Sequence, residues 1–149
     1  MLFRSKVLNS RTVLQRARRD APLCDRDGEV GRAIRQLAGS AESAATATDL
    51  DALRGIEGDA SRQYFSVFGR MVSGEGFAFG GRSRRPPRDN VNAALSFVYT
   101  LLMHDARAAL ESAGLDSQVG FLHRDRPGRP RSEEHTSELQ SLRHLVCRL

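Results

Sequence analysis

Hydrophobic residues recur at steps of three and four along most of this chain, the spacing that gathers them on one face of an α-helix. The pattern predicts helices over residues 6–19, 29–38, 49–72 and 90–113. Asp89 is a suitable N-cap for the last helix, while Gly39 and Gly114 are expected to end the second and the fourth. Because the chain shows no sustained strand-like alternation and no internal repeat, the predicted fold class is all-α.

The segments between these helices are small, polar or rich in glycine and proline. Residues 20–28 read as a turn that includes Cys24, which we expect to behave as a small, half-buried hydrophobic side chain. Residues 40–49 read as a connector, and residues 73–89 as an irregular segment with four glycines and the pair Pro86-Pro87. The fourth helix is apolar around most of its first half, so we expect it to be the central and most buried helix.

The third predicted helix carries the longest apolar stripe and also an anomaly. The members of the stripe are Leu50, Leu53, Ile56, Ala60, Tyr64, Val67, Phe68 and Met71. Gly55 and Gly58 interrupt it on either side of Glu57, and each glycine costs up to about 1 kcal/mol relative to alanine inside a helix. The close approach of another backbone or of a ligand would explain two such residues.

The charge of the chain is basic, and arginine carries it. The 149 residues contain 23 Lys and Arg against 18 Asp and Glu, a net charge of +5, and Lys6 is the only lysine. Since the guanidinium group binds phosphate in a two-pronged manner, this balance suggests nucleic acid as a partner; a GC-rich genome, whose codons favour arginine, explains it equally well.

Composition also narrows the class of protein. No apolar run approaches the roughly 20 residues that a membrane-spanning helix requires, and the first 20 residues lack the features of a secretory signal, so we expect a cytoplasmic protein without a membrane partner. Two cysteines are too few for a disulfide scaffold or a four-ligand zinc site.

Residues 131–149 read as foreign to the protein. The sequence RSEEHTSELQSLRHLVCRL resembles the translation of a short-read sequencing adapter, with both constant segments in place around a short variable index. We therefore predict that residues 1–130 are native protein and that His135, His144 and Cys147 belong to no site; a native polar C-terminal helix is the alternative. The first 130 residues keep the net charge of +5, with 20 basic and 15 acidic side chains.

Two residues are candidates for chemistry before any family is considered. Glu57 lies beside an apolar stripe, where an unpaired carboxylate is costly, so a structural ion pair with Arg54 or Arg62 is one interpretation. His123 follows Phe121 and Leu122 and could equally be structural. A carboxylate and an imidazole are compatible with Mn²⁺ or Mg²⁺, but no sequential motif joins the two residues.

Three successive blocks resemble one known family. They read LRGIEGDASRQYF, FAFGGRSRRPPRDNVNAALSFVYTLL and VGFLHRDRPGRP, and they follow a first helix, KVLNSRTVLQRARRD, that is similar to the first helix of the family's helical domain. The family is the CRISPR-associated integrase of the spacer-acquisition (adaptation) complex, a metal-dependent DNA endonuclease of antiviral defence. The resemblance covers essentially residues 6–130.

The resemblance implies an all-α catalytic domain that binds Mg²⁺ or Mn²⁺ through a Glu, a His and an Asp. The Glu of the IEG block corresponds to Glu57 and the His of the GFLH block to His123. The family's Asp lies in a segment just downstream that this chain does not contain. The β-rich N-terminal domain that builds the family's homodimer is also absent, so residues 1–130 are expected to be a fragment of the helical domain.

The implied activity is the insertion of new spacers into a CRISPR array, in which a 3′-hydroxyl attacks a phosphodiester. The implied partners are double-stranded DNA (the CRISPR repeat and the pre-spacer), a second copy of the protein, and the second protein of the adaptation complex. The arginines expected to neutralise phosphates are Arg82, Arg84, Arg85, Arg88, Arg124 and Arg126. Without the third ligand, the chain as written is expected to bind metal poorly and to cut nothing.

Two other interpretations stay open. The chain could be a non-catalytic, basic helical module that binds nucleic acid or a protein, in which case Glu57 and His123 would be dispensable. It could also be an arginine-rich scaffold with no salt-dependent affinity for DNA.

Overall fold

A computed structural model describes residues 2–72 and 76–117, which form two units. The first unit extends to Ala94 and the second begins at Leu95. The described residues contain helices and loops and no strand, which confirms the all-α prediction.

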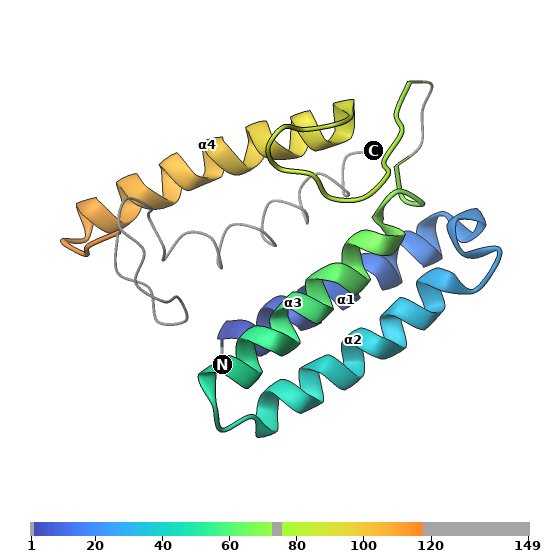
Figure 1. Cartoon of the computed structure of the whole chain (residues 1–149), viewed down its shortest axis with the longest axis horizontal. Coiled ribbons are helices and arrows are strands. Elements are labelled where there is room, and N and C mark those ends of the chain that lie inside the picture. Colours follow the sequence, from blue (N-terminus) through green and yellow to red (C-terminus); the bar gives the residue numbers. More distant parts are fainter. Residues whose placement is uncertain (1, 73–75, 118–149) are drawn as a thin grey trace. The chain divides into compact units, whose positions relative to one another are not determined.

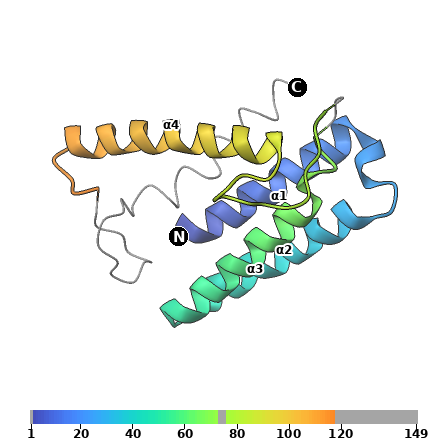
Figure 2. The same cartoon turned by 45° about the horizontal axis from the view of Figure 1, so that its top comes forward.

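Three long helices make up most of the first unit (Figures 1 and 2). These are α1 (Leu2–Asp20), α2 (Glu29–Thr46) and α3 (Leu50–Phe68), with the 3-10 helix η1 (Pro22–Asp25) between α1 and α2. Short connections place successive helices antiparallel and side by side. The helix α2 packs against both α1 and α3, and α1 also contacts α3.

The core of this unit is built from the faces that the apolar periodicity predicts. Its largest fully buried side chains are Leu14 of α1, Val30 and Leu37 of α2, and Tyr64 of α3. Tyr64 also contacts the ring of Phe68, one turn further along α3, with ring centroids 5.8 Å apart. Burying these side chains supplies the main free energy that holds the three helices together.

The helix α2 runs past the glycine that was expected to end it. It continues to Thr46, so that the predicted connector over residues 40–49 shrinks to residues 47–49. Ala41, one turn beyond Leu37, is buried on the same face of α2. This continuing contact offsets the penalty of about 1 kcal/mol for Gly39 inside the helix, so the prediction of a stop there was wrong.

Both limits of α4 and the start of α3 lie within one residue of the predicted ones. The helix α1 begins at Leu2, four residues before its expected start, and α3 ends at Phe68, four residues before its expected end. Asp49 caps α3, its side chain accepting a hydrogen bond of 3.0 Å from the backbone N–H of Ala52. The helix α4 (Asn90–Ser112) begins after Asp89, and Gly114 beyond its end has a φ of 74°, the left-handed conformation that glycine favours.

The expectation that α4 is the most buried helix was wrong for the described part of the chain. Val91, Asn92 and Leu95 in its first turns are buried, but the side chains of Phe97 and Leu101 are 65% and 50% exposed. Apolar residues around a helix favour its burial against another segment, but they do not specify which segment packs against it.

None of the helices in residues 2–72 and 76–117 combines the length and the apolar character needed to cross a membrane.

Candidate functional site

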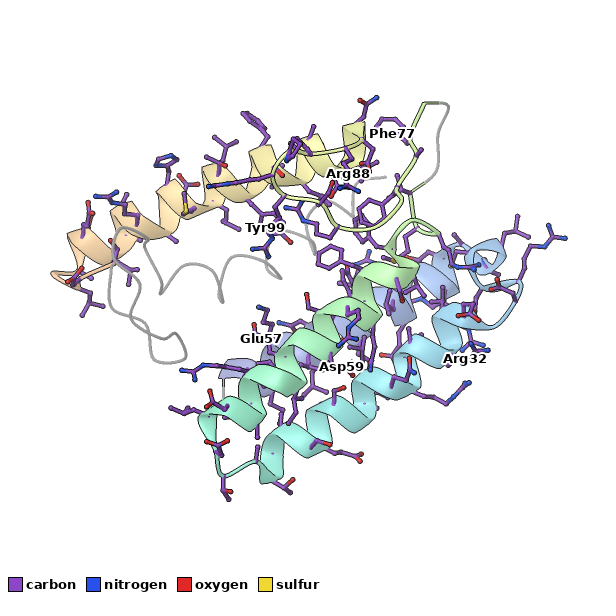
Figure 3. All side chains as sticks on the ribbon, in the orientation of Figure 1. Arg32, Glu57, Asp59, Phe77, Arg88 and Tyr99 are labelled. Atoms are coloured by element: carbon purple, nitrogen blue, oxygen red, sulfur yellow. The ribbon has the colours of Figure 1, made fainter. Side chains whose placement is uncertain are left out.

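Glu57 lies in the middle of α3 and forms an ion pair with Lys6 of α1 (Figure 3 labels Glu57). The Lys6 Nζ donates a hydrogen bond of 2.7 Å to Glu57 Oε1. The two side chains are only 13% and 19% exposed, so the pair is mostly shielded from solvent. A carboxylate in such a position needs an opposite charge. Lys6, 51 residues earlier in the sequence, supplies this charge.

An ion pair at Glu57 was expected, but its partner was not identified from the sequence. The two arginines proposed for that role lie against other carboxylates: Arg54 pairs with Asp51, and Arg62 pairs with Asp59 at 3.2 Å. Both are local pairs within one turn of α3. Lys6 was not predicted as the partner of Glu57, because no periodicity or spacing in the sequence relates the first turns of α1 to the middle of α3.

A carboxylate oxygen such as that of Glu57 is the type of ligand that Mg²⁺ and Mn²⁺ prefer. In this structure the ammonium of Lys6 binds its Oε1. Within residues 2–72 and 76–117, no group of three or more His, Cys, Asp or Glu side chains converges to form a complete metal site. Glu57 therefore qualifies as one ligand of a site that needs further donors.

Gly55 and Gly58 leave open space on either side of Glu57. A Cβ placed on either glycine would meet no heavy atom within 4 Å among the described residues. Packing within this part of the chain therefore does not require them, and they are also not needed for a left-handed turn, since both lie inside α3. The approach of a ligand backbone remains a prediction for these two positions.

The remaining expected site residues follow residue 117 in the sequence. His123, Arg124 and Arg126 lie outside the described residues. The predicted convergence of Glu57 with His123 therefore stays a prediction, as does the role of the arginines that follow it.

The four predicted DNA-binding arginines of residues 82–88 fall into two groups. Arg84, Arg85 and Arg88 are exposed, and Figure 3 shows the position of Arg88. Arg82 is only partly exposed, and its Nη1 donates hydrogen bonds of 3.0 Å to the side-chain oxygen of Asn92 and to the carbonyl of Ser83. A contact between Arg82 and phosphate would compete with these bonds.

Asn92 organises this arginine-rich loop, which we define as residues 81–89. The Asn92 side chain is fully buried and donates to the carbonyl of Gly81 at 2.8 Å and to Asp89 Oδ2 at 2.7 Å. Its oxygen accepts the backbone N–H of Ser83 at 2.8 Å as well as the Arg82 bond. The loop is therefore held by specific hydrogen bonds to the start of α4.

Asp89 completes this arrangement as the N-cap of α4. Its Oδ1 accepts a hydrogen bond of 2.7 Å from the backbone N–H of Asn92, and this bond lowers the pKa of the Asp89 carboxyl from its ordinary value of 3.8. The sequence indicated the cap, because an Asp directly before an apolar helical run is a common N-cap. The sequence did not indicate the role of Asn92, because nothing in it distinguishes Asn92 from the other polar side chains of this segment as the one that holds the loop.

Comparison with solved structures first defines the class of protein. The chain is similar to a chain of the solved "Partial Cas6-RT-Cas1--Cas2 complex", with a TM-score of 0.79 and 31% sequence identity; the match covers 99% of this chain and 42% of the other. The helical fold is therefore that of a CRISPR-associated protein.

Sequence comparison identifies the family. Residues 1–131 match the profile of the family "CRISPR associated protein Cas1", and the chain belongs to this family. It is 52% identical over 127 residues to "CRISPR-associated endonuclease Cas1 1" of Chlorobaculum tepidum, covering 84% of this chain and 37% of that protein. It is 51% identical over 141 residues to "CRISPR-associated endonuclease Cas1 2" of Rhodospirillum rubrum, covering 87% of this chain and 39% of that protein. The chain thus spans less than two fifths of the length of either relative.

Proposed function

We propose that this chain is part of the catalytic helical domain of a metal-dependent DNA endonuclease and integrase, which inserts new spacers into CRISPR arrays. Membership of the Cas1 family and relatives named endonucleases support the chemistry. The observation that carries the proposal to a residue is the place of Glu57 in the middle of α3, between Gly55 and Gly58, where a Cβ would meet no heavy atom within 4 Å.

In this proposal Glu57 and His123 bind one Mg²⁺ or Mn²⁺ ion. When bound, such an ion polarises a phosphoryl oxygen and stabilises the negative charge that develops as a 3′-hydroxyl attacks a phosphodiester. Glu57 contributes a hard oxygen from a rigid helix, which fixes the position of that ligand. Gly55 and Gly58 leave the adjacent surface of α3 clear of side chains, so that a DNA backbone can approach it.

The exposed arginines of the loop serve binding rather than chemistry. Arg84, Arg85 and Arg88 neutralise phosphates without reading the base sequence. Because this neutralisation releases the counter-ions bound to DNA, the affinity for DNA falls as the salt concentration rises. Arg82, which is engaged by Asn92, contributes mainly by holding the loop in shape. Arg124 and Arg126 extend the same basic surface in this proposal.

The proposed partners of the whole protein are a second copy of itself, a second protein of the adaptation complex, and double-stranded DNA in the cytoplasm. The similar solved chain comes from an assembly whose title joins Cas1 with Cas2, which supports the second of these partners.

The test of the proposed metal site is binding of Mn²⁺ to the purified chain. We expect weak binding that Glu57→Gln abolishes, whereas Asp59→Asn, a matched change two residues away on α3, leaves it intact (Figure 3). We also expect no DNA cleavage by the chain alone, because the family resemblance implies a site that needs an Asp ligand in addition to Glu57 and His123. Robust cleavage that Glu57→Ala abolishes would show that this Asp is dispensable. Mn²⁺ binding equal in both variants would refute the site.

A non-catalytic module that only binds nucleic acid is the second candidate, and the exposed arginines favour it. Under this alternative, Glu57→Ala leaves all measurable behaviour unchanged, while the double charge reversal Arg84→Glu/Arg85→Glu removes DNA binding. An electrophoretic mobility shift titration at two salt concentrations separates the two functions, because only the endonuclease proposal couples DNA binding to Mn²⁺ through Glu57.

A further inference from the structure

Lys6 is the only lysine among the 23 basic residues of the chain, and the structure places it against the candidate metal ligand Glu57. Other ion pairs of the same unit use arginine. Arg18 binds Asp25 with 2.7 Å between Nε and Oδ2, and Arg70 binds Asp27 with 2.7 Å between Nη2 and Oδ2. The single departure from arginine thus falls at the carboxylate on which the proposed chemistry depends.

The two basic side chains bind a carboxylate differently. A guanidinium group presents a planar fork that can engage both carboxylate oxygens at once, which makes it a firm structural partner. An ammonium group is a compact point charge that binds one oxygen through one of three rotatable hydrogens. The hydrogen bond of Lys6 reaches Oε1 of Glu57. A lysine is therefore the partner that can leave the carboxylate when a stronger cation arrives.

The position of the pair makes this exchange specific. The ammonium comes from α1 and the carboxylate from α3, so the pair fixes the Glu57 side chain between two packed helices. With 13% and 19% of the two side chains exposed, water screens their attraction only in part. A divalent cation at Oε1 would lie next to the ammonium, and the repulsion between the two charges favours the departure of the lysine.

We propose that Lys6 is a positioning residue that acts as a built-in counter-ion: it holds Glu57 in place before a divalent cation binds, and it is displaced from the carboxylate when the cation binds. This inference rests on the proposed metal-binding function of Glu57. It goes beyond that function because it assigns to Lys6 the setting of the metal affinity, through competition for the same oxygen.

The experiment measures Mn²⁺ binding to the full chain by the loss of the electron paramagnetic resonance signal of the free ion. Lys6→Met keeps the aliphatic stem and removes the competing charge, so its Kd for Mn²⁺ should fall about tenfold. Lys6→Arg replaces the point charge with a fork, so its Kd should rise by about the same factor. Arg16→Met, which removes an exposed charge of α1 paired with Asp20, should leave the Kd unchanged.

The outcomes separate this inference from the function beneath it. If Glu57→Gln abolishes Mn²⁺ binding while both Lys6 variants bind as the unaltered chain does, Lys6 is only a structural partner and the inference is overturned, although the metal site stands. The inference is also overturned if Lys6→Met weakens binding while Lys6→Arg preserves it. If no Mn²⁺ binding depends on Glu57, the proposed function and the inference fall together. Lys6→Arg keeps the ion pair, so it reports on the competition even if Lys6→Met does not fold.

Discussion

The ion pair between Lys6 and Glu57 should couple α1 to α3 by a free energy that a double-mutant cycle can measure. The cycle compares the unaltered chain with Lys6→Met, Glu57→Gln and the double variant. A hydrogen bond of 2.7 Å between charged groups that are 13% and 19% exposed falls among charge-assisted bonds, whose net contribution is about 1.5–3 kcal/mol. We therefore expect a coupling free energy of about 2 kcal/mol.

The assay is urea unfolding followed by circular dichroism at the helical band, without divalent cations. In a domain of this size, a loss of 2 kcal/mol corresponds to a fall in Tm of about 4–8 °C, so a thermal scan gives an independent check. The pair between Arg16 and Asp20 provides the control. Its side chains are 48% and 54% exposed, so its own cycle should yield less than about 1 kcal/mol.

A coupling free energy at Lys6 and Glu57 no greater than that of the control pair would refute the reasoning. It would mean that the two charges are hydrated separately in solution, and that the helices α1 and α3 are held by apolar packing alone. The proposed competition between Lys6 and a metal ion would then lose its structural basis.

Three further predictions concern other parts of the chain. Gly55→Ala and Gly58→Ala should each raise the free energy of unfolding by about 0.5–1 kcal/mol in urea titrations, because a Cβ at either position meets no neighbour within 4 Å; a loss of stability would reveal a contact that the described residues do not show. The Asp89 cap stabilises the folded chain fully at pH values above 3.8, the ordinary pKa of the carboxyl, and this stabilisation is lost as the pH falls through the lowered pKa of the folded state. The chain should therefore unfold at lower urea concentrations below pH 4. The variant Asp89→Asn should reduce this acid sensitivity. Burial raises the pKa of the Cys24 thiol, so Ellman's reagent should modify it far more slowly in the native chain than in urea, and equal rates would contradict its burial.

The helices of the described chain were largely predictable, because a periodicity of 3.6 residues and local capping are properties of neighbouring residues. Asp89 and Gly114 bound α4 as expected, since each acts within one turn of the helix. The prediction at Gly39 failed because the penalty for glycine is small compared with the burial of Ala41, and burial depends on what packs opposite.

In the candidate site, too, the local features could be predicted from the sequence, whereas the contacts between distant residues could not. Glu57 was identified from its neighbouring glycines and from the family resemblance, and its need for a partner followed from its place beside an apolar stripe. The identity of that partner, Lys6, did not follow, and neither did the role of Asn92 in tying down the loop that carries Arg84 and Arg85. His123 and the arginines after it stay predictions, as does the division of the chain at residue 130.

The amino-acid sequence alone determined the helical class, the approximate helix limits, the basic charge and the family, because these depend on local order and on motifs read in succession. Only the tertiary structure decided which charge faces Glu57 and which arginines of the loop are exposed. The reason is physical: 51 residues separate Lys6 from Glu57, and the packing of α1 and α3 around a shared apolar core, not any relation along the chain, sets the 2.7 Å between their charged atoms.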